Sequence, residues 1–232
     1  MAETTLTWLG HASFRMDTAD GQRIYIDPFL NGNPACPESE LTPERVDVIA
    51  VTHGHGDHVG DTVDLAQKHG ATVVALVELA GWFGRNGVDE GKLLNPNKGG
   101  TVDVDGTKFT LTNAFHSGSA PDGSYAGEPS GIIVTTSDGK KVYFAGDTCV
   151  FGDMQLIGKI YEPDVAVLPI GDHFTMGPKE AAVAIELLGT KRIVPCHYGT
   201  FGLLTGTPDA LKELAPSGAT IEDIEPGSSL TL

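Results

Sequence analysis

The chain contains one dense histidine segment, Thr52-His53-Gly54-His55-Gly56-Asp57-His58. It directly follows the apolar, β-branched run at residues 46–51, which predicts a strand buried on both faces. Three imidazoles and a carboxylate within six residues are ligand types that Zn²⁺, Fe and Mn²⁺ take from proteins. Gly54 and Gly56 are expected to allow sharp turns, so that alternate side chains converge. The segment therefore predicts a metal site at a strand end, and its alternative is a solvated loop that caps the next helix.

Three further candidate ligands also come at the carboxyl ends of predicted strands. These are His116 after residues 108–115, Asp147 after residues 141–145, and His197 after residues 192–196. Taken singly, the aspartate is an ordinary turn residue and the two histidines are ordinary strand-end histidines. Together with the histidine segment they make four strand-terminal sites in one chain, which favours one shared metal centre over coincidence.

The rest of the chain alternates between strand and helix patterns. Strands are expected at residues 4–9, 13–16, 23–26, 46–51, 72–77, 101–104, 108–115, 131–136, 141–145, 165–170, 192–196, 220–224 and 229–232. Helices are expected at residues 61–69, 78–85, 153–161, 179–188 and 209–214. Asp-Gly turns between several strand pairs are typical of hairpins. Hairpins mixed with strand–helix–strand units predict an α/β (α+β) fold with two sheets and outer helices, in a single domain over residues 1–232.

Composition limits the partners and the location. Lys and Arg number 15 against 31 Asp and Glu, a net charge of −16 that argues against nucleic acid and anionic membranes. No stretch reaches the ~18 uninterrupted apolar residues of a membrane-spanning helix, and the first residues lack a signal-peptide pattern. The three cysteines give no disulfide framework, and Cys149 and Cys196 are expected to pack in the core. We therefore expect a cytoplasmic protein, with no membrane partner, that acts on a small molecule.

The order of the candidate ligands resembles a known family. H-x-H-x-D-H, then His, then Gly146-Asp147-Thr148, then His is similar to the metallo-β-lactamase superfamily of metal-dependent hydrolases. The resemblance covers nearly the whole chain and implies a four-layer αββα sandwich. The flanking segments at residues 8–14, 26–29 and 171–178 resemble a compact branch of that superfamily related to L-ascorbate-6-phosphate lactonase.

The resemblance also implies a centre of two divalent metal ions per chain. It assigns His53, His55 and His116 to one metal, Asp57, His58 and His197 to the second, and Asp147 as the bridge between them. Two such cations lie ~3.5–4 Å apart and activate a hydroxide between them, so no side-chain nucleophile is required. The histidine-rich set favours Zn²⁺, with Mn²⁺, Fe or Ni²⁺ as alternatives. A homo-oligomer is compatible with this branch.

Further candidates lie outside the metal ligands. His11, in the turn between the first two predicted strands, is expected to contact substrate, shuttle a proton or hydrogen-bond a ligand. His173, in the loop before the helix at residues 179–188, is expected to line the pocket, and its alternative is a structural loop histidine. With Asp57 these two histidines make the predicted catalytic set. Asp27 is expected either to orient a ligating imidazole or to start a turn.

Three functions remain for such a centre. The leading one is hydrolysis of a small-molecule ester, lactone or phosphoester. A phosphodiesterase or nuclease of the tRNA 3′-processing type shares the metal motif, but the charge of −16 and the lack of an inserted RNA-gripping arm disfavour it. The third is a catalytically inactive metal-binding protein, which would need a blocked pocket because every ligand position is filled. The glycine- and serine-rich loop at residues 117–130 is expected to gate the site or to contact another subunit.

Overall fold

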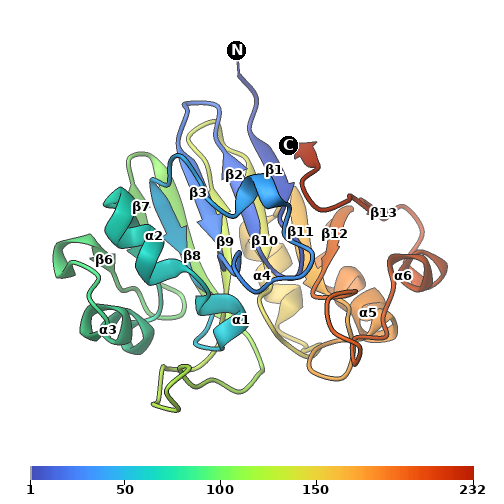
Figure 1. The fold of residues 1–232 in the computed structure, drawn as a ribbon. Helices are drawn as coiled ribbons and strands as arrows, with labels where there is room; N and C mark the ends of the chain where they lie inside the picture. The colour runs from blue at the N-terminus through green and yellow to red at the C-terminus, as the bar shows by residue number, and fades with distance from the viewer. Residues whose placement is uncertain (1) are drawn as a thin grey trace.

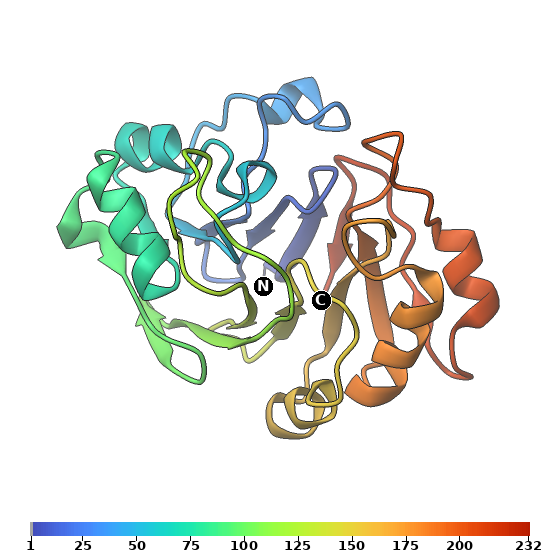
Figure 2. The same ribbon diagram turned by 90° about the horizontal axis from the view of Figure 1, so that it is seen from below.

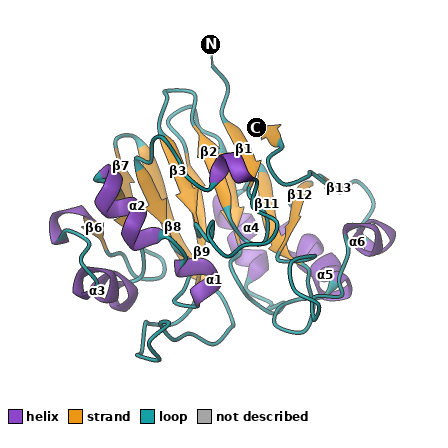
Figure 3. Ribbon diagram, in the orientation of Figure 1, coloured by secondary structure: helices purple, strands orange, loops and turns teal. Residues whose placement is uncertain are grey.

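The computed structural model describes residues 2–232 and contains two seven-stranded β-sheets (Figure 1). In Figure 3 the strands occupy the middle of the molecule and the helices lie on either side of them. Both chain termini lie at the same end of the molecule, opposite helix α1.

The first sheet is built from the first half of the chain and the last strand. Its order is β14 (Ser229–Thr231), β1 (Thr5–Trp8), β2 (Phe14–Asp17), β3 (Arg23–Ile26), β4 (Val48–Ala50), β5 (Thr72–Val74) and β6 (Leu93–Leu94). Strands β14, β1, β2 and β3 pair antiparallel, and β3, β4, β5 and β6 pair parallel. The sheet therefore changes from hairpins to parallel strands at β3.

The second sheet repeats this plan. Its order is β7 (Thr101–Val104), β8 (Thr107–Asn113), β9 (Ser130–Thr135), β10 (Lys141–Phe144), β11 (Val165–Pro169), β12 (Arg192–Cys196) and β13 (Thr220–Ile221). Strands β7 to β10 pair antiparallel, and β10 to β13 pair parallel. The hairpins expected on both sides of the Asp105-Gly106 and Asp138-Gly139 turns are confirmed.

Helices α2 to α6 cover the outer faces of the two sheets, whereas α1 lies at the end of the sheets opposite the termini. The helices are α1 (Gly56–Val59), α2 (Thr62–His69), α3 (Val77–Arg85), α4 (Met154–Tyr161), α5 (Pro178–Leu188) and α6 (Pro208–Leu214), with short 3₁₀ turns η1 (Glu38–Glu40) and η2 (Glu90–Lys92). Seen from below in Figure 2, the helices of the two halves lie on opposite outer sides with the strands between them. Within residues 2–232 the helices are all too short or too polar to cross a membrane.

Three buried clusters define the layers. The central cluster joins inner side chains of both sheets, such as Phe14 and Val48 from the first and Phe109 and Val167 from the second. A second cluster packs α2 and α3 on the first sheet, and a third packs α4, α5 and α6 on the second. Burial of apolar surface on both faces of each sheet stabilises four layers, so the predicted αββα sandwich is confirmed.

Some predicted elements differ from the observed ones. The strand expected at residues 72–77 ends at Val74, because Val77 already begins α3 and Leu79, Ala80 and Phe83 are buried at helical spacing. The two-residue strand β6 was not predicted, since it is too short to carry a periodic pattern. Part of the histidine segment is helical, as α1, where a loop was expected.

Candidate metal centre

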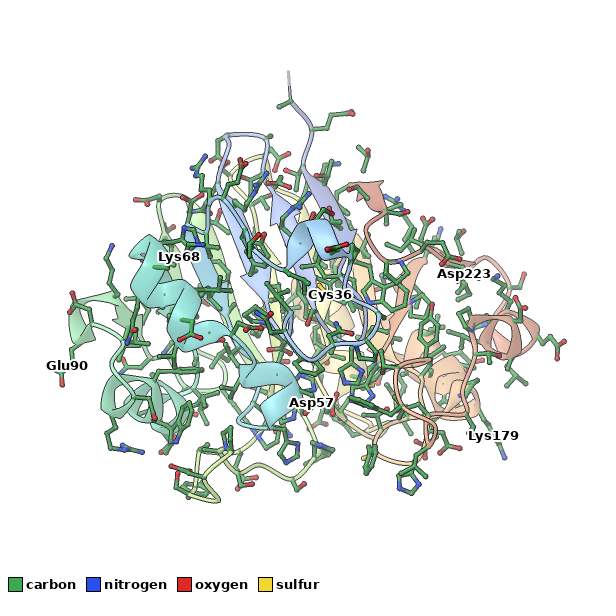
Figure 4. All side chains as sticks on the ribbon, viewed as in Figure 1. Cys36, Asp57, Lys68, Glu90, Lys179 and Asp223 are labelled. Carbon is green, nitrogen blue, oxygen red and sulfur yellow. The ribbon has the colours of Figure 1, made fainter. Side chains whose placement is uncertain are left out.

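All the candidate ligands lie at one end of the two sheets. The carboxyl ends of parallel strands meet at the same edge, so the loops after β3, β4, β10 and β12 are brought together there. Figure 4 labels Asp57 at this end, on α1 and far from both termini. Each sheet supplies part of the cluster, because the histidine segment follows β4, whereas Asp147 and His197 follow β10 and β12.

The side chains form two neighbouring groups. The first is His53, His55 and His116, the second is His11, Asp57, His58 and His197, and a third set, His53, His58 and Asp147, shares a member with each. Within each group the ligand atoms lie within 4.8 Å of one another. Nε2 of His53 lies 3.0 Å from Nδ1 of His55. Two nitrogen ligands on a tetrahedral Zn²⁺, with Zn–N about 2.0–2.1 Å, are separated by roughly 3.3 Å. The spacing therefore suits two nitrogen ligands of one ion.

Asp147 lies between the two groups. Its Oδ2 is 3.2 Å from Nε2 of His197, 3.5 Å from Nε2 of His116 and 4.0 Å from Nε2 of His53. Its Oδ1 is 3.4 Å from Nε2 of His58. One carboxylate thus faces nitrogen atoms of both groups, which is the position that a bridging ligand requires.

Several of these ligand atoms are buried without a hydrogen-bond partner. Within residues 2–232 no hydrogen bond reaches Nε2 of His58, Oδ1 of Asp147 or Nε2 of His197, although both nitrogens lie within 3.4 Å of an Asp147 oxygen. A buried polar atom without a hydrogen bond costs about 1–3 kcal/mol, so three at one point need an explanation. A divalent cation accepts lone pairs from imidazole and carboxylate, and the donor set fits such an ion.

A carboxylate behind the cluster fixes which nitrogen of each imidazole faces inward. Oδ2 of Asp27 lies 2.7 Å from Nδ1 of His58 and also accepts the hydroxyl proton of Thr52 at 2.7 Å. The same hydroxyl lies 3.0 Å from Nδ1 of His53 and accepts from it. Both rings therefore donate from Nδ1, which leaves Nε2 as the nitrogen that faces the cluster. This agrees with the orienting role expected for Asp27.

His11 is fully buried and bridges two loops. Its Nε2 lies 3.0 Å from Oδ2 of Asp57 and its Nδ1 lies 2.7 Å from the hydroxyl of Thr200. A carboxylate only accepts, so Nε2 donates to Asp57 and Nδ1 accepts from Thr200. Burial lowers the pKa of His11 to about 4 although the Asp57 carboxylate opposes the shift. The ring is therefore neutral at pH 7, which favours a role in orienting Asp57.

Burial and the central ion pairs shift the pKa values of the cluster residues in different directions. At His197 burial lowers the pKa, but the carboxylates of Asp147 and Asp57 outweigh it and raise the pKa to about 9. Burial also opposes ionisation of Asp147, yet His58 and His197 hold its pKa well below the usual range. Burial dominates at His53 and lowers its pKa. A bound cation would replace the protons shared in these pairs.

Backbone geometry also marks the site. His11, Asp27 and His197 have positive φ values of 55°, 46° and 55°, a region that costs most non-glycine residues free energy. Gly54 and Gly56 were expected to allow sharp turns, but neither has a positive φ. A Cβ on Gly54 would lie 2.7 Å from Cβ of Ala126, so this glycine permits the loop at residues 117–130 to pack closely.

The remaining candidates lie outside the cluster. His173 is exposed, and its ring packs edge-on against Phe174 at 4.4 Å between centroids. Phe174, rather than His173, lines the pocket above the cluster, and a catalytic role for His173 stays a prediction. Cys196 is buried as expected, whereas Cys149 is exposed, because its side chain turns away from the core. Sequence patterns missed Thr200, since a lone threonine in a loop carries no ligand signal.

Comparison with known proteins agrees with this geometry. The family profile described as Beta-lactamase superfamily domain matches residues 22–198. A UPF0173 metal-dependent hydrolase of Herpetosiphon aurantiacus is 52% identical over 216 residues, covering 91% of this chain and 90% of the relative. One of Methanosarcina mazei is 41% identical over 240 residues and covers both chains fully. The solved structure of Igni18, a metallo hydrolase from Ignicoccus hospitalis, has a TM-score of 0.88 and 34% identity, covering 100% of this chain and 99% of that one.

The fold, the cluster and these likenesses together define an enzyme of the metal-dependent hydrolase class. The chain belongs to the metallo-β-lactamase superfamily, as its ligand order predicts. A closer relation to L-ascorbate-6-phosphate lactonase stays a prediction.

Proposed function

We propose that the protein is a hydrolase with two divalent metal ions, acting on a small-molecule ester, lactone or phosphoester. The observation that carries the proposal is the pair of ligand groups that meet at Asp147 with buried, unpartnered ligand atoms. One ion would be held by His53, His55 and His116, the second by Asp57, His58 and His197, and Asp147 would contact both. Zn²⁺ suits this donor set best, with Mn²⁺, Fe and Ni²⁺ as alternatives.

When bound, a pair of divalent ions lowers the pKa of a water molecule and polarises the carbonyl or phosphoryl oxygen of the substrate. The residues of this chain hold the geometry for that chemistry. Asp27 and Thr52 keep Nε2 of His58 and of His53 free for ligation. His11 holds one oxygen of Asp57, whose side chain is 28% exposed toward the pocket. Because Nε2 of His11 donates to Asp57 and Nδ1 is held by Thr200, the ring is placed to orient this carboxylate.

The alternatives differ in what they need around the metals. A nuclease would need cations to hold a phosphate backbone, yet the net charge is −16 and the pocket lining contains neither Lys nor Arg. We therefore propose a small-molecule substrate and no nucleic-acid partner. An inactive metal-binding protein would need an obstructed site, whereas the pocket over the cluster has a volume of about 370 Å³.

The first experiment measures metal content and turnover together. Elemental analysis of the protein is expected to give about two divalent ions per chain. 4-Nitrophenyl esters, γ-lactones and bis(4-nitrophenyl) phosphate are then assayed with and without a chelator, and His53→Ala is expected to lose both metal and turnover. Metal-free protein that hydrolyses these substrates at the same rate, or His53→Ala with full activity, would overturn the proposal.

A further inference from the structure

The pocket over the metal cluster has two kinds of wall. One part of its lining is formed by cluster residues, including His55, Asp57 and His116, and the other part by Phe174 and Phe201 with the small side chain of Ser117. Its volume of about 370 Å³ lies in the range of ~300–1,000 Å³ that small-molecule sites occupy. The cluster residues supply ligands, so the apolar wall of Phe174 and Phe201 decides which substituents are accepted.

The two phenylalanines come from neighbouring loops at the ligand end of the second sheet. Phe174 follows β11 and Phe201 follows β12, and these strands pair in parallel. Phe174 is 49% exposed and Phe201 is 39% exposed, so neither ring belongs to the core. The Phe201 ring packs edge-on against the buried ring of His11 at 5.1 Å between centroids, which holds it in place.

The pocket lining contains no charged side chain outside the cluster. The side chains of the lining that can carry a charge, Asp57, Asp147 and the lining histidines, all belong to the cluster. A phosphate group remote from the reacting bond is normally held by Arg or Lys, and this lining contains neither. Placing such a group against phenyl rings would remove its water without replacing its hydrogen bonds.

Resting on the proposed metal centre, we infer that the pocket takes uncharged esters or lactones with an aryl or alkyl substituent packed against Phe174 and Phe201. It selects against substrates that carry a remote phosphate. Water adds across the acyl C–O bond, which breaks to give a carboxylic acid and an alcohol from an ester, or one hydroxy acid from a lactone, and no further reactant is needed. Each methylene that leaves water strengthens binding about fourfold, so the length of an apolar chain reports on the wall.

Hydroxamates test this inference by binding alone, because the hydroxamate group chelates metal and the tail extends from it. Calorimetry with the Zn²⁺-loaded protein compares acetohydroxamate, hexanohydroxamate and a 6-phosphonohexanohydroxamate. Hexanohydroxamate is expected to bind at least tenfold tighter than acetohydroxamate, and the phosphonate no tighter than acetohydroxamate. In Phe174→Ala and Phe201→Ala the gain from the longer tail should shrink to about threefold or less. Leu203→Ala, an exposed side chain on the same loop as Phe201 but outside the lining, is expected to keep the full gain.

The outcomes separate this inference from the metal centre beneath it. If acetohydroxamate binds the metal-loaded protein but not His53→Ala, and the tail adds nothing or the phosphonate binds best, the apolar wall is refuted and the metal centre stands. If acetohydroxamate fails to bind metal-loaded protein, both proposals fall. Turnover gives a second test. The parent protein should hydrolyse 4-nitrophenyl hexanoate with a higher kcat/KM than 4-nitrophenyl acetate, and Phe201→Ala should reverse this preference.

Discussion

Asp27→Asn tests whether the carboxylate behind the cluster controls metal binding. Oδ1 of Asp27 accepts the backbone N–H of Thr52 at 2.8 Å, and Oδ2 accepts the Thr52 hydroxyl and Nδ1 of His58 at 2.7 Å each. Asparagine has nearly the same shape and tolerates the positive φ of 46° at this position. The substitution therefore changes the hydrogen bonding while leaving the packing alone.

The size of the effect follows from these contacts. An amide has one accepting oxygen, so its NH₂ must face either the backbone N–H of Thr52 or Nδ1–H of His58, and in both orientations donor meets donor. A buried donor left unpaired costs about 1–3 kcal/mol. Loss of such a partner behind a ligating histidine typically weakens metal affinity by about 10–100-fold. We expect a loss of this size for at least one of the two ions.

The assay is a competition titration of Zn²⁺ between the protein and a chromophoric chelator. Asp61→Asn is the matched control, because this carboxylate accepts backbone N–H groups of Leu30 and Asn31 at 2.8 and 2.9 Å without contacting a candidate ligand. The control is expected to bind Zn²⁺ as the parent protein does. Unchanged affinities in Asp27→Asn, or an equal loss in Asp61→Asn, would refute the reasoning.

Three further predictions concern other parts of the centre. His11→Asn removes the imidazole that donates to Asp57, so the affinity for one ion should fall about tenfold while the affinity for the other stays unchanged. Parent-like affinities for both ions in the same titration would contradict this. His197 has a raised pKa of about 9, so in metal-free protein its stabilising charge is complete below about 6.5 and is lost as the pH rises through 9. Urea unfolding should therefore give a free energy on the order of 3 kcal/mol lower at pH 9.5 than at pH 6.5, and an equal or higher value would count against the Asp147 pair. A Cβ on Gly171 would lie 2.0 Å from the carbonyl oxygen of His197, so Gly171→Ala should lower the Tm by roughly 10 °C, whereas Gly202→Ala, with no atom within 4 Å, should not.

The clustering of the candidate ligands could be predicted from the sequence, because strand periodicity and residue chemistry coincide there. Apolar runs end in His, Asp or both, and parallel strands bring those ends together, so Asp147 after β10 and His197 after β12 could be expected to meet without any coordinates. The sequence indicates that Asp27 orients a ligating imidazole, but it does not indicate which one. The answer depends on Thr52, which lies between two imidazoles only when β3 and β4 pair.

The pocket wall could not be predicted from the sequence. Phe174 and Phe201 lie in loops without periodicity, and an isolated loop phenylalanine is as often a packing residue as a binding one. The exposed position of His173 depends on positive φ values at Asp172 and His173, which no pattern in the sequence indicates. The role of Gly54 was also hidden, because it depends on a segment some seventy residues later packing against it.

Because the candidate ligands come from both sheets, they are synthesised in a fixed order. The first sheet carries the histidine segment, but Asp147 and His197 belong to the second sheet. A growing polypeptide on the ribosome thus displays four of the five candidate histidine ligands before Asp147 and His197 have been made. Those early imidazoles can capture stray ions only in an incomplete shell. The complete set of candidate ligands therefore exists only after β12 has been synthesised and the two sheets have packed together.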